Sequence, residues 1–185
     1  MELPVINHPD YVAKINDDNK FPIRKFGALA KHLLENNVVK KFHIPKECSF
    51  ETLKTSHSTE YINHIKNKTL DIKAQKKIGF PINDSVVKRS FVATGGTVLA
   101  SKLALDSKLA CNTAGGSHHA TFDFGAGYCV FNDVAVAANY LKNKGYAKKI
   151  LIIDLDVHQG NGNSEIFKND KDVITFSMHC ASNYP

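Results

Sequence analysis

The chain has 185 residues, of which 43% are hydrophobic, and its 24 Lys and Arg against 18 Asp and Glu give a formal net charge of +6. This length and composition are ordinary for one globular domain with a sizeable core. The basic residues lie in short groups without interleaved aromatic residues. They predict solvated faces or a general attraction to polyanions, and they exclude specific nucleic-acid recognition.

The spacing of the four cysteines argues against a zinc ribbon or a disulfide framework and favours a reducing compartment. No apolar run approaches the roughly 18 residues of a membrane span. The N-terminus also lacks the basic and apolar regions of a signal peptide. We therefore expect a cytoplasmic protein with no membrane partner.

The first half of the chain is predicted to be mainly helical. A periodic apolar pattern after Pro22 predicts a helix that ends near Asn36–Asn37. Ser58 is expected to open a short helix, and a long helix with an Asn cap should cover residues 83–105. The pair Gly95–Gly96 inside this long helix costs about 1 kcal/mol per glycine relative to alanine, so close packing or a kink is expected there.

The second half is predicted to alternate helices with apolar strands. Strands are expected over residues 108–113, 149–156 and 172–179, and helices over residues 132–145 and near 165–167. This alternation predicts a mainly parallel sheet covered by helices on both faces, in an α/β fold. Ligands of such sheets bind beyond the C-terminal ends of the strands. The polar residues that follow those ends are His118, His119, Asp156, His158, Ser177 and His179.

The apolar run over residues 150–153 is followed by Asp154, Asp156 and His158 at alternating positions. Side chains two apart on a strand point the same way, so Asp156 and His158 can converge on a cation. Asp-x-His before a glycine loop suits a catalytic zinc, although it could also cap the loop by hydrogen bonding. Asp154 adds a third polar group to an apolar strand, which is costly unless it is paired or metal-bound. The pattern therefore favours a metal site.

The adjacent histidines His118 and His119 follow two glycines. They could be a polar loop pair, or two imidazoles that serve amide hydrolysis beside an activated water molecule. In the second case each imidazole needs a partner that fixes its tautomer, and Asp154 and Asn161 are candidates. Together with the Asp-x-His motif, the pair predicts a metal-dependent hydrolase.

Two tyrosines and several histidines leave alternatives open. Tyr128 and Tyr184 could be core aromatics or the walls of a narrow apolar slot. The remaining histidines have no evident partner in the sequence and are assigned to the surface or to packing. They are His8, His32, His43, His57 and His64.

Three segments, Gly-Gly-Ser-His-His-Ala, Gly-Tyr-Cys-Val-Phe-Asn-Asp and Asp-Leu-Asp-Val-His-Gln-Gly-Asn-Gly, resemble the histone deacetylase family. This family includes bacterial acetylpolyamine amidohydrolases and acetoin-utilisation proteins. The motifs of this sequence are most similar to those of its bacterial and class IV-like branch. The resemblance implies an arginase-like, three-layer α/β/α fold, with residues 1–185 as the N-terminal part of one deacetylase domain. It also implies zinc-dependent hydrolysis of an N-acetyl amide, in acetyl-lysine or an acetylpolyamine.

The resemblance implies roles for the two histidines and their partners. His119 matches the general base and acid, and His118 matches its electrostatic companion. Asp154 matches the carboxylate partner of one histidine. Asn161 stands where many members have a second aspartate, so the support of His119 should be weaker here.

The resemblance also implies ligand sites. Asp156 and His158 match two of the three zinc ligands, Gly127 and Tyr128 match the floor and one wall of the acyl-lysine tunnel, and Tyr184 matches the other wall. A structural potassium ion is implied by a further set, in which methionine contributes its carbonyl oxygen. That set is Asp154, Asp156, His158, Ser177 and Met178.

The chief departure from the family is in length. Members continue for on the order of a hundred residues more, and that part carries an aspartate as the third zinc ligand and a tyrosine that polarises the acetyl carbonyl. We therefore expect little or no turnover from this chain alone, unless a separately encoded C-terminal fragment supplies both groups. The alternatives are a non-catalytic remnant of a split gene and a binding module for acylated ligands or another subunit.

Overall fold

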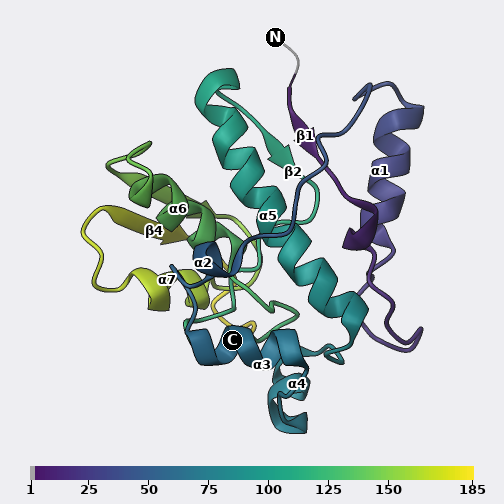
Figure 1. Cartoon of the computed structure of the whole chain (residues 1–185), viewed down its shortest axis with the longest axis vertical. Helices are drawn as coiled ribbons and strands as arrows, with labels where there is room; N and C mark the ends of the chain where they lie inside the picture. The colour runs from purple at the N-terminus through teal and green to yellow at the C-terminus, as the bar shows by residue number, and fades with distance from the viewer. Residues whose placement is uncertain (1–2) are drawn as a thin grey trace.

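The computed structural model describes residues 3–185, in which helices surround two short parallel sheets (Figure 1). The helices are α1 (Lys25–Glu35), α2 (Phe50–Leu53), α3 (Thr59–Asn67), α4 (Ile72–Ile78), α5 (Asp84–Ser107), α6 (Asp133–Asn143) and α7 (Asn161–Phe167), with a 3-10 turn at Pro9–Tyr11. The strands are β1 (Val5–Ile6), β2 (Cys111–Asn112), β3 (Ile150–Asp154) and β4 (Val173–Ser177).

Helices α3, α5 and α6 begin where the sequence predicts, because each has a polar N-cap residue. The side chains of Ser58, Asn83 and Asn132 each accept a hydrogen bond from the backbone N–H three residues later. Such a cap satisfies one of the N–H groups that the first helical turn leaves without a partner. These three helix starts are confirmed.

Helix α5 runs through the middle of the molecule, with β1 and β2 beside one half of it (Figure 1). The expected close packing at its two glycines is confirmed. A methyl group on Gly95 would overlap the carbonyl of Lys46, and one on Gly96 would overlap the hydroxyl of Tyr11. Tyr11 Oη in turn donates to Asn112 Oδ1 at 2.8 Å, which links the helix to the end of β2.

Both sheets are parallel, as predicted, but they are two separate pairs of strands within residues 3–185. β1 pairs with β2, and β3 pairs with β4 in a register that runs from Ile150 opposite Val173 to Asp154 opposite Ser177. The strands are shorter than predicted. Since β3 ends at Asp154, Asp156 and His158 come from the loop after the strand, which corrects the prediction that the strand extends to residue 156.

The helices differ from the expectations in three places. α7 begins at Asn161, several residues earlier than predicted, and has no side-chain cap. Its first turn is held instead by tertiary bonds, from the N–H groups of Gly162 and Asn163 to the carbonyl of His118 at 2.8 and 3.2 Å. The short helices α2 and α4 were not predicted. No helix of the described chain is long and apolar enough to cross a membrane.

The apolar core has a larger and a smaller part. The larger part joins α3, α5 and the loops around them, with Leu53, Ile62 and Val92 almost fully buried. The smaller part lies between one face of the β3–β4 sheet and helices α6 and α7. Its buried members are Ala135, Ala138, Ile152, Phe167 and Val173.

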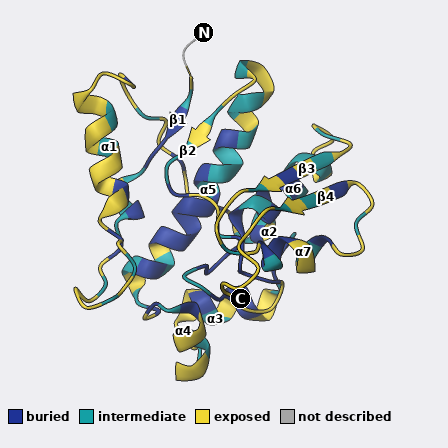
Figure 2. Cartoon of the chain, turned by 180° about the vertical axis from the view of Figure 1, so that it is seen from behind, coloured by how far each residue is buried: buried dark blue, intermediate teal, exposed yellow. Residues whose placement is uncertain are grey.

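The opposite face of the β3–β4 sheet is apolar and exposed. Leu151 lies opposite Ile174 and Ile153 lies opposite Phe176 in the register, and these side chains are 58%, 60%, 59% and 51% exposed. Figure 2 shows this as alternating exposed and buried residues along the strands. We call these residues the bare sheet face. Exposed apolar patches of this kind mark interaction surfaces.

Candidate active site

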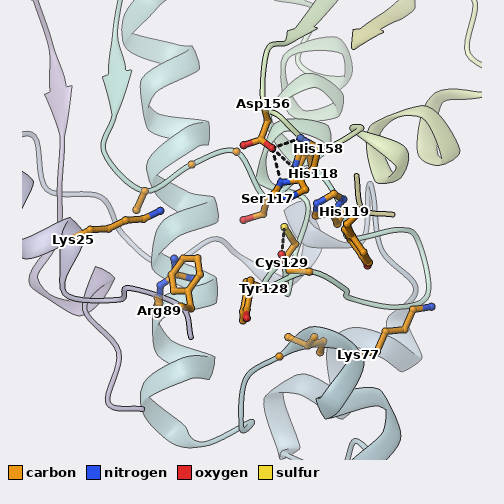
Figure 3. Close-up of a pocket in the computed structure, with 18 of the residues that line it drawn as sticks. Lys25, Lys77, Arg89, Ser117, His118, His119, Tyr128, Cys129, Asp156 and His158 are labelled. Carbon is orange, nitrogen blue, oxygen red and sulfur yellow. Dashed lines mark hydrogen bonds and ion pairs between the residues drawn. The ribbon is translucent and has the colours of Figure 1, made fainter. Parts of the chain in front are cut away.

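One pocket of about 650 Å³ is lined by most of the residues that the sequence singles out (Figure 3), although Asp154, Asn161, Ser177 and Met178 are not among them. It is lined by loops that follow β2 and β3, by the segment around Tyr128 and by Tyr184 near the C-terminus. The pocket therefore lies beyond the C-terminal ends of parallel strands, as expected for an α/β sheet.

The paired histidines are buried and each has a partner at Nδ1. His118 and His119 are 6% and 3% exposed, with ring centroids 4.1 Å apart. His118 Nδ1 donates to Asp154 Oδ2 at 2.6 Å, and His119 Nδ1 donates to Asn161 Oδ1 at 2.7 Å. Because both protons are engaged at Nδ1, Nε2 of each ring is the free nitrogen. The partners are those that the sequence suggested.

A buried carboxylate orders the loop in front of the histidines. Asp133 is 1% exposed, and it accepts hydrogen bonds from the backbone N–H of Gly116 at 3.1 Å and of Ser117 at 2.7 Å. It also accepts the hydroxyl of Thr97. The sequence suggested only a helix cap here, because nothing in its local pattern indicates a contact with a loop about 16 residues earlier.

Burial favours the neutral form of the second histidine. It lowers the pKa of His119, an effect that the hydrogen bond to Asn161 opposes and the neighbouring His118 and His158 reinforce. A neutral imidazole with a free Nε2 can accept a proton from a bound molecule. His119 can therefore accept a proton at Nε2 in the pocket.

Asp156 and His158 lie on the other side of the histidine pair and point toward each other. His158 Nδ1 is 2.9 Å from Asp156 Oδ1, which also accepts the His158 backbone N–H at 2.7 Å. Asp156 Oδ1 is 3.8 Å from His118 Nε2. Burial would raise the pKa of Asp156, but the hydrogen bonds from His158 and the charges of the two histidines outweigh it, and the pKa is lowered.

These two side chains suit zinc in type and position but not in number. Zinc ligands at about 2.1 Å from one ion lie roughly 3 to 3.5 Å apart, so Nδ1 and Oδ1, which are 2.9 Å apart in their hydrogen bond, would have to separate slightly to bind one ion. A catalytic zinc takes three protein ligands. Within residues 3–185 there is no group of three or more His, Cys, Asp and Glu side chains that could hold a metal ion.

The residues matched to the tunnel form two walls of the pocket. Gly127 has φ +53°, and a Cβ there would lie 2.6 Å from the ring of His119, so the position requires glycine. Tyr128 also has a positive φ of 65°, and its ring packs 5.0 Å from that of Phe21. The ring of Tyr184 meets that of His119 edge-on at 4.9 Å.

The residues matched to a potassium ion lie at the adjoining ends of β3 and β4. Asp154 and Ser177 are paired in the register, and the Met178 N–H donates to the Asp154 carbonyl at 3.0 Å. The Asp154 carboxylate, however, is engaged by His118 and by the Asp156 N–H. The potassium assignment stays a prediction.

The pocket holds no activated protein nucleophile among the described residues. Burial raises the pKa of the Cys129 thiol to about 12, so the reactive thiolate is absent near neutral pH. Ser117 is held through its backbone by Asp133, and no hydrogen bond of the described chain joins its hydroxyl to an imidazole.

Two buried polar residues, Arg89 and His57, were not predicted from the sequence to have a structural role. Arg89 of α5 is 6% exposed and lines the pocket, and its Nε donates to the Tyr11 carbonyl at 3.0 Å. His57 was assigned to surface or packing without a partner, yet it is 1% exposed. It bonds the Thr121 carbonyl at 2.8 Å and accepts the Asn132 N–H at 2.9 Å. Neither has a local signal, because their partners are distant in sequence.

Several proteins are similar in sequence to most or all of this chain. An uncharacterised protein of Picosynechococcus sp. (strain ATCC 27264 / PCC 7002 / PR-6) is 45% identical over the whole chain, which covers 62% of that protein. Histone deacetylase 2 of Arabidopsis thaliana is 30% identical over 89% of this chain and 45% of its own length. The acetoin utilization protein AcuC of Staphylococcus aureus is 29% identical over 90% of this chain and 46% of its own. The chain thus spans about half the length of most of these relatives.

Solved structures and the family comparison agree. The chain superposes with a TM-score of 0.84 on an HDAC homologue complexed with SAHA, and with 0.83 on an HDAC homologue from Aquifex aeolicus. The identities are 28% and 29%, over 97% of this chain and 51% of each structure. The expected arginase/deacetylase-like α/β fold is confirmed. The histone deacetylase domain matches residues 20–185. The chain therefore belongs to the histone deacetylase family.

Proposed function

We propose that this chain provides the proton-transfer residues and two metal ligands of a zinc-dependent amide hydrolase. The substrate would be an N-acetyl amide, in acetyl-lysine or an acetylpolyamine. The observation that carries the proposal is the convergence of His118 and His119 with Asp156 and His158 around one pocket. The HDAC homologue that binds SAHA has the same fold, which supports an acyl-binding role for the pocket.

The two histidines would divide the work of hydrolysis. His119 would take a proton from water through Nε2 and deliver it to the leaving amine. His118, held by the Asp154 carboxylate, would support charge on the carbonyl oxygen. Asn161 is neutral, so it holds His119 in place and raises its basicity less than a carboxylate would.

Asp156 and His158 would hold the zinc ion. When bound, zinc supplies Lewis acidity, which polarises the amide carbonyl and lowers the pKa of a water molecule. Gly127, Tyr128 and Tyr184 would enclose the acyl chain and exclude water from it. Potassium near Asp154 and a cytoplasmic location remain part of the proposal.

We propose that the third zinc ligand and the carbonyl-polarising tyrosine come from the part of the domain that the relatives have and this chain does not match. The bare sheet face is where that polypeptide would pack, because it is apolar and adjoins the strand ends that carry the site. Residues 3–185 alone should then bind zinc weakly and turn over acetylated substrates slowly or not at all. An oxyanion that lacks one donor is about 3 kcal/mol less stable.

The test is the zinc content of the purified chain, with and without the unmatched C-terminal part of the Picosynechococcus relative. We expect zinc to be retained only in the mixture, together with hydrolysis of acetyl-lysine peptides. Retention that survives His158→Ala would contradict the metal assignment. Turnover by the chain alone at the rate of an intact family enzyme would contradict the need for the unmatched C-terminal part.

A second candidate is a non-catalytic module that binds acylated ligands. The specific observation in its favour is a formed pocket with an incomplete set of metal ligands. Saturable binding of a hydroxamate, with no hydrolysis even after the C-terminal part is added, would favour this module. A remnant without specific function would show neither.

A further inference from the structure

The pocket is lined by cationic side chains that have no role in the proposed hydrolysis. Its lining contains a single carboxylate, that of Asp156, which the proposed function assigns to the metal. Four permanently cationic side chains line the same pocket, and they are Lys25, Lys76, Lys77 and Arg89. A ligand therefore meets a positive potential before any metal is counted.

Two of these cations stand at the rim, on the last turn of α4. The carbonyls of Lys77 and Ile78 accept the N–H groups of Gly127 at 3.1 Å and of Tyr128 at 2.6 Å. The end of the helix is thus tied by its backbone to the wall of the proposed acyl slot. Figure 3 shows Lys77 at the opposite end of the pocket from Asp156. The position of the two lysines is fixed relative to the slot.

The charges of this lysine pair are not neutralised. Lys76 and Lys77 are exposed, and neither forms an ion pair with a carboxylate of residues 3–185. The Lys77 ammonium lies 3.5 Å from the centroid of the Phe124 ring, a contact that holds a cation without cancelling its charge. The rim therefore presents two unpaired positive charges to the part of a bound ligand that extends out of the slot.

We propose that this rim selects the substrate by charge, and the inference rests on the proposed function. With the acyl group at His118 and His119, the rest of the amine passes the tyrosines and emerges beside Lys76 and Lys77. An acetylpolyamine would place its second ammonium group near these lysines and be repelled. An acyl-lysine in a peptide with Asp or Glu neighbours would be attracted, so the site takes acyl-lysine in acidic sequences.

The test compares two fluorescein-labelled peptides that carry a hydroxamate analogue of acyl-lysine, flanked by Asp in one and by Lys in the other. Fluorescence polarisation with the full chain, the C-terminal part of the Picosynechococcus relative and zinc gives both affinities, and unlabelled N-acetylspermidine serves as a competitor. Exposed ion pairs change affinity by about two- to five-fold each, so we expect the acidic peptide to bind roughly ten-fold more tightly. The preference should shrink in 0.5 M salt, because screening weakens exposed charge pairs.

A charge-reversed double variant, Lys76→Glu with Lys77→Glu, should reverse the preference. The matched control is Lys148→Glu with Lys149→Glu, an exposed lysine pair that precedes β3 at the end remote from the site. It changes the net charge equally and should leave the preference intact.

Equal affinities, no saturable binding of either peptide, efficient competition by N-acetylspermidine or the same effect from the control pair would each overturn the inference. The proposed function fails separately. Binding with the expected preference but without hydrolysis after the C-terminal part is added would refute the hydrolase alone. Hydrolysis that ignores the flanking charges would refute only the selection by charge.

Discussion

Ile152 and Ile153 are adjacent in β3 and point to opposite faces of the sheet. Their substitution should therefore destabilise the fold to very different extents. Ile152 is 7% exposed and packs against α6 and α7, whereas Ile153 is 59% exposed on the bare sheet face. Threonine keeps the β-branched shape that suits a strand. Ile152→Thr and Ile153→Thr therefore differ mainly in the apolar surface that they remove from the core.

The expected difference follows from burial. Full burial of an isoleucine side chain contributes about 1.5 to 3 kcal/mol, and a buried hydroxyl without a partner adds a further cost of about 1 kcal/mol. Ile152→Thr should thus lower the free energy of unfolding by about 3 kcal/mol. Ile153→Thr should change it by about 0.5 kcal/mol, as exposed substitutions do.

Urea unfolding followed by circular dichroism measures both values. With a slope of about 1 to 3 kcal/mol per molar urea, the two midpoints should differ by roughly 1 M or more. When the C-terminal part of the Picosynechococcus relative is present, Ile153→Thr should in addition weaken the complex about ten-fold, because it removes an interface contact. Equal losses of stability in the two variants, or a complex indifferent to Ile153→Thr, would refute this view of the sheet.

Three other outcomes are expected. Burial lowers the pKa of His57 to about 4. Because the unfolded state binds a proton at a higher pH than the folded state, the free energy of unfolding should fall by about 3 kcal/mol as the pH drops from 6.5 to 4. Urea titrations across this range should show a shallower slope in His57→Gln. Gly96→Ala should cost about 2 kcal/mol or more, because the methyl overlaps the Tyr11 hydroxyl; a thermal midpoint within 2 °C (about 0.5 kcal/mol) of wild type would exclude that overlap. Asp156→Asn should weaken zinc binding by roughly ten-fold or more, as measured by competition with a chelating dye. The melting temperature of the metal-free chain should stay unchanged.

The sequence predicts best what is decided locally. Ser58, Asn83 and Asn132 cap helices through hydrogen bonds that span three residues, so the pattern and the structure coincide there. Helix α4 had the same signal, since Asp71 accepts the Ala74 N–H at 2.8 Å and Gly79 follows the last turn. Its start was predictable and was overlooked.

Long-range contacts decided the rest. Asp133 orders the histidine loop, and the first turn of α7 is held by the His118 carbonyl. No pattern within α6 or α7 reveals such partners. The spacing of Asp156 and His158 did suggest a shared cation, but their convergence arises from the bend after β3 rather than from strand alternation. The chemistry was predictable and its geometric cause was not.

The two halves of the site depend on different parts of the domain. His118 and His119 are at least nine-tenths buried, and their partners Asp154 and Asn161 lie within the described chain, so their geometry is complete without a further polypeptide. The side chains of Asp156 and His158, the proposed metal ligands, are 50% and 38% exposed, and residues 3–185 hold no group of three such ligands. Addition of the missing part should therefore change metal affinity greatly and the histidine hydrogen bonds little. Nitrogen chemical shifts of the two imidazoles, recorded before and after that addition in zinc-free buffer, separate the two effects: a large change would show that the histidine pair also depends on the added C-terminal part.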